Sequence, residues 1–191
     1  MQIGCILMAA GNATRFGENK LAAEYQGKPL FVHALDAIPD EELYRVVVVT
    51  QYDEIRLVAE ARGYKTVINR SPEDGISHTI HLGMDELMEA DAIMFLVADQ
   101  PRLRRESVRR EVQFFCDHKD SIVAMGKDKR RGNPAIFPKE FFQMLRELDE
   151  DAGGSEVIRK CADKLLLYQL KDEVEMFDVD SVKELEELRA R

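Results

Sequence analysis

A loop of small residues with two basic side chains follows the first apolar run of the sequence. The segment 8–20 reads MAAGNATRFGENK, and its two alanines and Gly11 would let a ligand approach the backbone closely. Successive N–H groups in such a loop can surround an anion, and Arg15 and Lys20 would add positive charge for a triphosphate. The spacing is neither GxGxxG nor GxxxxGK[ST]. Taken by itself, the loop fits a triphosphate site and an ordinary strand-to-helix connection equally well.

Carboxylates follow two further apolar runs that lie far apart in the sequence. Asp99 comes directly after the most hydrophobic run, where a carboxylate is costly unless a cation such as a phosphate-bridging Mg²⁺ compensates it. Asp178 and Asp180 precede the last helical stretch, and period-two spacing would place them on opposite faces of a strand. We therefore expect Asp180 alone to join Asp99 as a metal ligand. The alternatives are a turn capped by Asp99 and a helix N-terminus stabilised by the other two carboxylates.

Two other segments carry candidate ligand contacts. The segment 71–79 is a turn leading into a helix, where the Ser77 and Thr79 hydroxyls could hold a base or a phosphate, although Ser77 could equally be a plain N-cap. A basic run precedes Gly-Asn-Pro and could hold an anionic acceptor; it consists of Lys127, Lys129, Arg130 and Arg131. A solvated charged hairpin is the alternative for that run.

The elements that must position these residues alternate between short apolar runs and amphipathic stretches. Strands are predicted at 3–9, 44–50, 65–68, 92–98, 121–125, 135–137, 165–170 and 175–179, and helices at 29–38, 53–62, 77–88, 106–118, near 138, 153–161 and 181–189. Ser181 and Glu184 form a predicted capping box. The alternation predicts a single Rossmann-like α/β domain over 1–191, with a mostly parallel sheet between two helical layers. Ligands should bind beyond the carboxyl ends of its strands.

Composition limits the class of protein. The 191 residues are 45% hydrophobic and 33% charged, as in an ordinary globular protein, and no apolar run approaches the ~20 residues of a membrane helix. The net charge of −9 argues against nucleic acid as a partner. Three scattered cysteines and the lack of a basic leader favour a reducing compartment, so we expect a cytoplasmic protein.

Taken in order, the motifs resemble those of a known family. The series AAG-x-x-x-R-F-G-x-x-K, G-I-S-x-T-I, D-Q-P, R-G-N-P and D-x-D before a final helix is similar to the molybdenum cofactor nucleotidyltransferases, above all the molybdopterin cytidylyltransferase-like branch. These enzymes have the fold of the nucleotide-diphospho-sugar transferases, and the resemblance covers essentially the whole chain. It implies Mg²⁺-dependent transfer of a nucleotidyl group from CTP to molybdopterin, with pyrophosphate released. A transient contact with a molybdoenzyme or its chaperone is also implied.

The resemblance assigns roles by position. It implies that the nucleotide lies against Met8, Ala9, Ala10 and Gly11, with its phosphates at Arg15 and Lys20 and its base or ribose near Gly75, Ser77 and Thr79. It also implies that Mg²⁺ is held by Asp99 and Asp180. The catalytic residues implied are Arg15, Lys20 and Asp99. Relatives that use GTP usually have glycine in place of Ala10, so this methyl group would favour a pyrimidine.

One departure from the family pattern bears on the acceptor. Ser155 stands where the family's G-D-x-G-A-R segment has an arginine. Two alternatives to the molybdopterin assignment therefore stay open: another acceptor, such as a sugar phosphate or methylerythritol phosphate, and a non-catalytic protein that binds a nucleotide or molybdopterin.

Overall fold

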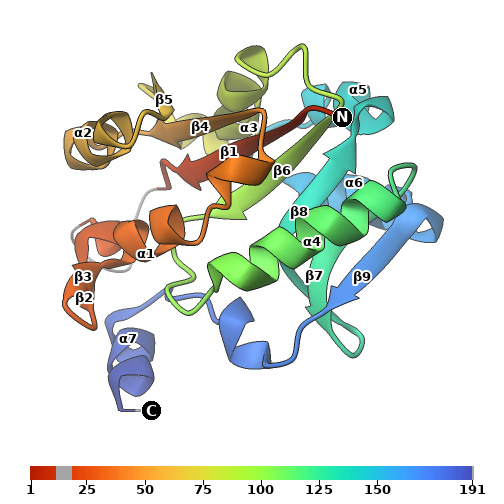
Figure 1. Ribbon diagram of the computed structural model, residues 1–191. Coiled ribbons are helices and arrows are strands. Elements are labelled where there is room, and N and C mark those ends of the chain that lie inside the picture. The colour runs from red at the N-terminus through yellow and green to blue at the C-terminus, as the bar shows by residue number, and fades with distance from the viewer. Residues whose placement is uncertain (12–18, 191) are drawn as a thin grey trace.

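One seven-stranded sheet runs through the middle of the molecule (Figure 1). The computed structural model describes residues 1–11 and 19–190. In the order β5-β4-β1-β6-β8-β7-β9, the strands are Lys65–Ile68, Arg45–Thr50, Ile3–Ala9, Ala92–Val97, Arg130–Pro138, Ile122–Lys127 and Leu165–Gln169. Strand β8 is antiparallel to both neighbours, and all other pairs are parallel. The predicted mostly parallel, Rossmann-like sheet is confirmed.

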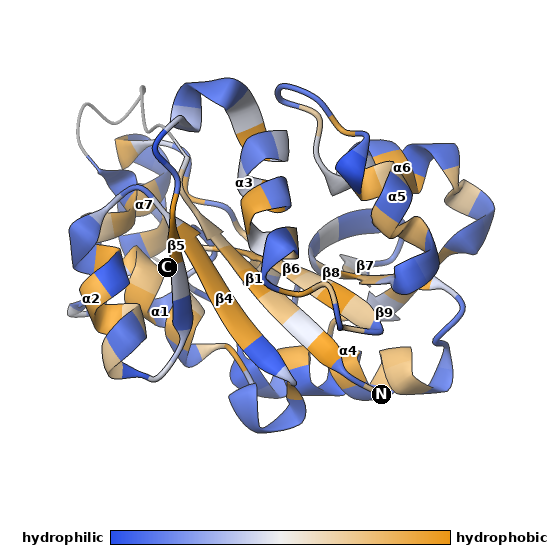
Figure 2. Cartoon of the chain, turned by 90° about the horizontal axis from the view of Figure 1, so that it is seen from above, coloured by the Kyte–Doolittle hydropathy of each residue, from blue (hydrophilic) through white to orange (hydrophobic). Residues whose placement is uncertain are grey.

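Helices cover both faces of this sheet (Figure 2). The helices are α1 Leu30–Asp36, α2 Asp53–Ala61, α3 Gly75–Asp85, α4 Arg105–Asp117, α5 Phe142–Arg146, α6 Gly154–Lys160 and α7 Val182–Arg189. Side chains of α1, α2 and α4 pack into one apolar cluster, and those of α3, α5 and α6 pack into another on the opposite face. The central strands are buried on both faces, which explains why their sequences are continuous apolar runs rather than alternating ones. None of the described helices is both long and apolar enough to cross a membrane.

The register of the central strands decides where the loops meet. Ala9 of β1 pairs with Thr50 of β4, and Met8 of β1 pairs with Val97 of β6. These three strands are parallel, so the segments that follow them emerge together at one edge of the sheet. A ligand bound at this edge would contact all three.

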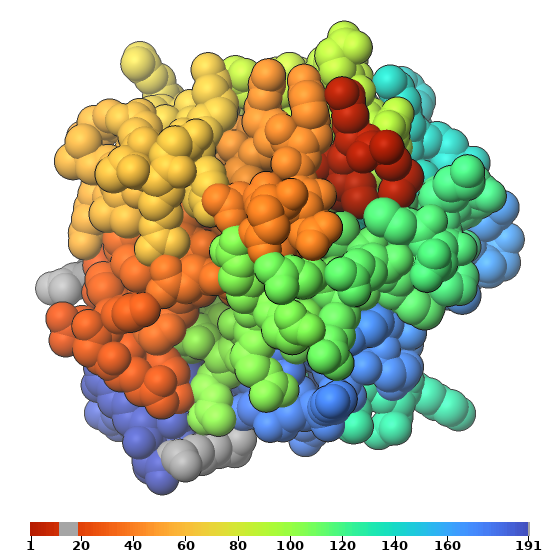
Figure 3. All heavy atoms as spheres, viewed as in Figure 1, coloured from red at the N-terminus to blue at the C-terminus, as the bar shows by residue number. Residues whose placement is uncertain are grey.

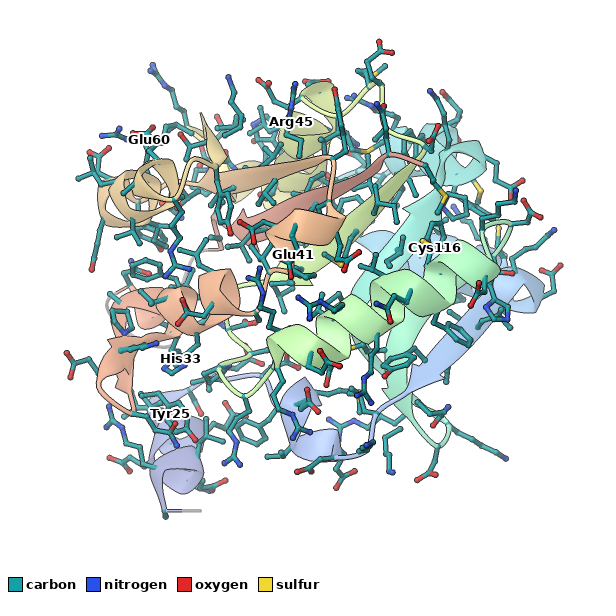
Figure 4. All side chains as sticks on the ribbon, in the orientation of Figure 1. Tyr25, His33, Glu41, Arg45, Glu60 and Cys116 are labelled. Atoms are coloured by element: carbon teal, nitrogen blue, oxygen red, sulfur yellow. The ribbon has the colours of Figure 1, made fainter. Side chains whose placement is uncertain are left out.

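The C-terminal segment returns to the segment that follows β1. A small hairpin, β2 Glu24–Tyr25 and β3 Lys28–Pro29, packs with α7 in a third apolar cluster, and Figure 3 shows the blue C-terminal residues below this orange-red part of the chain. The Tyr25 carbonyl also hydrogen-bonds His33 Nε2 of α1 at 2.7 Å, and Figure 4 shows these two residues side by side. This packing carries residues near 180 toward Lys20.

Three local predictions need correction. The segment 175–179 is not a strand: a 3-10 helix covers Glu173–Met176, because the Asp172 carboxylate accepts the Val174 N–H at 3.1 Å and starts a helical turn. Strand β8 is longer than the predicted 135–137 and includes the R-G-N-P residues. It forms a hairpin with β7, in which Arg131 pairs with Gly126 and the register shifts before Ala135 pairs with Ala124. Helix α3 begins at Gly75, two residues before the predicted start.

The predicted cap of the last helix is partly confirmed. Ser181 Oγ accepts the Glu184 N–H at 3.3 Å, as expected for an N-cap. The Glu184 carboxylate accepts the N–H of Asp180 at 2.9 Å, one residue earlier than a capping box requires. The contact ties the backbone of Asp180 to the first turn of α7.

Candidate active site

The chain leaves β1 through Ala10 and Gly11, and side chains that follow β4 hold it in place. Gln51 Nε2 donates to the Ala10 carbonyl at 2.9 Å, and the Tyr52 hydroxyl donates to the Gly11 carbonyl at 3.2 Å. Among residues 1–11 and 19–190, no atom lies within 4 Å of a Cβ atom added to Gly11. Packing against these described residues therefore does not require this glycine, and they leave space beside it for a ligand. Arg15, the predicted phosphate contact, lies outside the described residues.

Lys20 joins the two predicted metal ligands. Its Nζ donates to Asp99 Oδ2 at 2.8 Å and to Asp180 Oδ1 at 2.9 Å. The side chains of Lys20 and Asp99 are 16% and 20% exposed, whereas that of Asp180 is 57% exposed, so the pair opens to solvent on the Asp180 side. Burial lowers the pKa of Lys20, but Asp99 and Asp180 together outweigh burial and raise it. The structure thus brings together three of the residues that the sequence singled out.

A third carboxylate lies near this group, contrary to the prediction from strand alternation. Asp178 Oδ1 accepts a hydrogen bond from buried Gln100 Nε2 at 2.8 Å, and the Val179 N–H donates to the Asp99 carbonyl at 3.0 Å. Burial, with the nearby charge of Asp99, raises the pKa of Asp178. Because 175–179 is not a strand, Asp178 and Asp180 do not point to opposite faces of one. Sequence reasoning missed Gln100, although its place in the D-Q-P motif marked it.

The carboxylates suit a cation that takes further ligands from elsewhere. Asp99 Oδ1 is buried and has no hydrogen-bond partner among residues 1–11 and 19–190. Within the same ranges, no group of three or more His, Cys, Asp or Glu side chains could hold a metal by itself. Mg²⁺ usually binds one or two carboxylates and completes its shell with water and substrate phosphates. Asp99 and Asp180 fit that pattern, and the buried oxygen of Asp99 would gain a partner.

A cleft of about 470 Å³ adjoins the lysine and the loop after β1, within the usual size range of small-molecule sites. Its lining includes Met8, Ala10, Gly11, Lys20, Gly75, Ile76, Thr79, Asp99 and Asp151. Seven of the predicted site residues are in this set. Asp151 was missed as a site residue, because its loop shows no periodicity that would place it against the sheet edge.

Two predicted ligand contacts lie elsewhere. Ala9 is buried within β1, where its carbonyl accepts the Thr50 hydroxyl at 3.0 Å. Ser77 is buried as well and lines a neighbouring groove instead of the cleft. Its N–H donates to the Glu150 carbonyl at 3.0 Å and is therefore used in packing. By contrast, Thr79 lines the cleft, and its hydroxyl accepts from Asn69 Nδ2 at 3.1 Å.

Gly75 sets the distance between α3 and the loop that carries Asp151. Its φ is +86°, and a Cβ atom at this position would lie 2.3 Å from the backbone oxygen of Glu150. Only glycine permits this combination of backbone conformation and close approach. The role of Gly75 in this structure is to place one wall of the cleft.

The basic hairpin contributes one half-buried arginine. Arg131 Nη2 donates to Ser155 Oγ at 2.8 Å, and no ion pair of Arg131 is found in the described part of the chain. Burial lowers the pKa of this guanidinium. Lys127 is engaged by the carbonyls of Leu170 and Lys171, at 3.2 Å each. Arg131 therefore hydrogen-bonds to Ser155, the residue at which the chain departs from the family pattern.

Fold and site together define a class of protein. A mostly parallel sheet places a lysine, two carboxylates and a glycine-containing loop beside one cleft at the carboxyl ends of its strands, the arrangement of a nucleotidyltransferase domain. The family model described as "MobA-like NTP transferase domain" matches residues 5–165. The chain belongs to this family.

Curated relatives match the chain over part of their own length. It is 30% identical over 149 residues to the bifunctional protein GlmU of Desulfitobacterium hafniense, which covers 76% of this chain and 33% of the relative. It is 27% identical over 125 residues to the 3-deoxy-manno-octulosonate cytidylyltransferase of Brucella anthropi, covering 62% of this chain and 50% of the relative. The chain thus spans a third to a half of the length of these relatives.

Solved structures share the fold over the full chain. Rv0371c of Mycobacterium tuberculosis superposes with a TM-score of 0.85 at 18% identity and covers 100% of both chains. The same protein has been solved in complex with manganese, with a TM-score of 0.78 at 18% identity and coverage of 100% and 99%. A CMP:2-keto-3-deoxy-manno-octonic acid synthetase complexed with CTP gives 0.76 at 15% identity, with coverage of 100% and 98%. At these identities the likeness shows the fold.

Proposed function

We propose that this protein transfers a nucleotidyl group from a nucleoside triphosphate to a small phosphorylated acceptor and releases pyrophosphate. The observation that carries the proposal is that Lys20 hydrogen-bonds to both Asp99 and Asp180 beside the cleft. In the sequence these two carboxylates lie 79 and 160 residues after the lysine. In this reaction an acceptor phosphate oxygen attacks the α-phosphorus and the pyrophosphate oxygen leaves. An ionised phosphate needs no general base. The protein would therefore catalyse the reaction by positioning the two substrates and by neutralising the charge of the phosphates.

The residues of the site have distinct roles in this proposal. Lys20 contacts the phosphates, with Arg15 as the second predicted cation. Asp99 and Asp180 hold Mg²⁺, which when bound supplies charge neutralisation at the α-phosphate and the leaving group. The buried, unpartnered Asp99 Oδ1 supports the metal assignment, and so does the manganese complex of the Rv0371c structure.

CTP is the proposed triphosphate. Ala10 is buried and lines the cleft, so its methyl group narrows the space where guanylyltransferase relatives have glycine. The CTP complex of the synthetase that shares this fold supports the same choice. Equal affinities of the protein for CTP and GTP would refute it.

The acceptor is proposed to bind beside Arg131. This guanidinium is half-buried, and the Ser155 hydroxyl holds it at 2.8 Å, so it occupies the neighbourhood where the family has an arginine in the loop. An arginine there suits a phosphate group through bidentate hydrogen bonds. Molybdopterin is the acceptor that the motifs favour. A sugar acceptor is the second candidate, because one curated relative described above is a cytidylyltransferase named for 3-deoxy-manno-octulosonate, a sugar acid.

The test begins with binding and ends with turnover. Calorimetry with CTP, GTP, ATP and UTP in the presence of Mg²⁺ compares the wild type with Lys20→Ala and with Lys28→Ala, an exposed lysine paired to Asp36. CTP binding that needs Mg²⁺ and is lost only in Lys20→Ala would support the proposal. Selective binding of GTP or ATP would be consistent with the proposed reaction type but would refute CTP as the triphosphate. Binding of a triphosphate without release of pyrophosphate in the presence of any tested acceptor would favour the accessory-protein alternative.

A further inference from the structure

The ammonium group of Lys20 lies between the two carboxylates that are proposed to hold the metal. Its contacts with Asp99 Oδ2 and Asp180 Oδ1 are 2.8 and 2.9 Å, the length of charge-assisted hydrogen bonds. A divalent ion bound to the same carboxylates would lie within a few ångströms of this positive charge. Repulsion at such a distance is strong near a partly buried site. Lys20 and the ion therefore compete for one place.

We propose that Lys20 is a built-in counter-ion that keeps Asp99 and Asp180 from binding a divalent ion until a nucleoside triphosphate draws the ammonium away. This inference rests on the proposed function of the site. It adds an order to the site's assembly, because the metal becomes well bound only together with the nucleotide.

The position of Lys20 suits such an exchange. The side chain also lines the cleft, and its four-carbon stem lets Nζ swing from the carboxylates toward a bound triphosphate. The phosphates would replace the two hydrogen bonds that the ammonium gives up. The exposed side of the pair, at Asp180, leaves a path for the incoming ion.

Lys20 partly compensates the negative charge of Asp99 and Asp180 in the ligand-free site. Among the described residues, Lys20 is the cation paired with the largely buried Asp99 carboxylate, and loss of this pair would be costly in the ligand-free protein. With Lys20 in place, metal and nucleotide must each raise the affinity of the protein for the other by the same factor. Such couplings are typically about 5- to 150-fold.

The first experiment measures Mn²⁺ binding to the nucleotide-free protein by electron paramagnetic resonance of the unbound ion. It compares the wild type with Lys20→Gln, which removes the charge, and Lys20→Arg, which keeps it. We expect Lys20→Gln to bind Mn²⁺ at least about fivefold more tightly than the wild type, with Lys20→Arg close to the wild type. Equal or weaker binding by Lys20→Gln would overturn the counter-ion role.

The second experiment needs no variant and so does not depend on the folding of Lys20→Gln. The melting temperature of the wild type is measured with Mn²⁺, with α,β-methylene-CTP, and with both. We expect the shift with both to exceed the sum of the separate shifts. A shift with Mn²⁺ alone as large as that with both would overturn the exchange.

The two proposals fail in different ways. If no nucleotide binds under any condition, the proposed function and the nucleotide-driven release both fall, while tighter Mn²⁺ binding by Lys20→Gln would still show that Lys20 excludes the ion. If nucleotide binds but Mn²⁺ binds equally well without it, the proposed function survives and the counter-ion inference falls.

Discussion

Replacing Gly75 with alanine tests whether this glycine positions the wall of the cleft. The backbone at Gly75 has φ +86° and ψ −175°, a region that is essentially restricted to glycine. The added Cβ would lie 2.3 Å from the Glu150 carbonyl oxygen, whereas ordinary contacts begin at 3.4 Å. The loop at Glu150 would have to retreat by about 1 Å, since backbone atoms cannot rotate out of the way.

The expected cost has two parts. Holding a non-glycine residue in this conformation costs about 1–3 kcal/mol. The retreat also disrupts the hydrogen bond from the Ser77 N–H to the Glu150 carbonyl, 3.0 Å long in the native protein, at about 0.5–1.5 kcal/mol. Gly75→Ala should therefore lower the free energy of unfolding by about 1.5–4.5 kcal/mol. Because Asp151 lines the cleft on the same loop, nucleotide affinity should fall as well.

Urea unfolding of Gly75→Ala and Gly63→Ala distinguishes the cost of a positive φ from the cost of the close contact between position 75 and Glu150. Gly63 also has a positive φ, +79°, but a Cβ atom there meets nothing within 4 Å in the part of the chain that the structure describes. Its substitution should cost only about 1 kcal/mol and leave nucleotide binding unchanged. If the two variants lose the same stability within about 0.5 kcal/mol, the contact with Glu150 is not what requires glycine at position 75.

Four further predictions concern other residues. Asp99→Ala should lower the turnover rate by several orders of magnitude without preventing folding, measured as pyrophosphate release; retained turnover in the purified variant would refute its role. Gly11→Ala should change stability by less than about 0.5 kcal/mol, since the added Cβ meets no atom of the described residues, but it should weaken nucleotide binding about tenfold in calorimetry; unchanged affinity would show that the nucleotide does not lie there. Arg131→Gln should raise KM for the phosphorylated acceptor and leave the Kd of the triphosphate unchanged, and an equal loss for both substrates would contradict its assignment. Glu111 is fully buried, and burial raises its pKa well above 4.5, although a hydrogen bond from the Met125 backbone opposes the shift. The contribution of Glu111 to the free energy of unfolding should therefore be greatest below pH 4.5 and fall as the pH rises above it, by up to about 1.4 kcal/mol per unit. Glu111→Met should lack this contribution to the pH dependence in urea unfolding, and parallel pH profiles of the two proteins would refute the argument.

The sequence alone determined the class of fold. The continuous apolar runs of β1, β4 and β6 and the amphipathic stretches between them have local periods that indicate buried parallel strands and covering helices. The same runs indicated where the loops of the site begin. Because the strands that end at Ala9 and Val97 are parallel, the loops that follow them start at the same edge of the sheet. The residue types at those ends, Lys20 and Asp99, were enough to predict a charged ligand.

Only the tertiary structure decided how these residues meet. The hydrogen bonds of Lys20 join positions 79 and 160 residues apart, and they depend on the return of α7 to the β2–β3 hairpin. The place of Asp178 beside Asp99 follows from a 3-10 helix that the period-two pattern had concealed. Ser77 lines a groove beside the cleft, where its N–H donates to the carbonyl of Glu150 in a loop with no periodic signal. Local spacing determines which face of an element a side chain occupies, whereas contacts between distant segments depend on how the whole core packs.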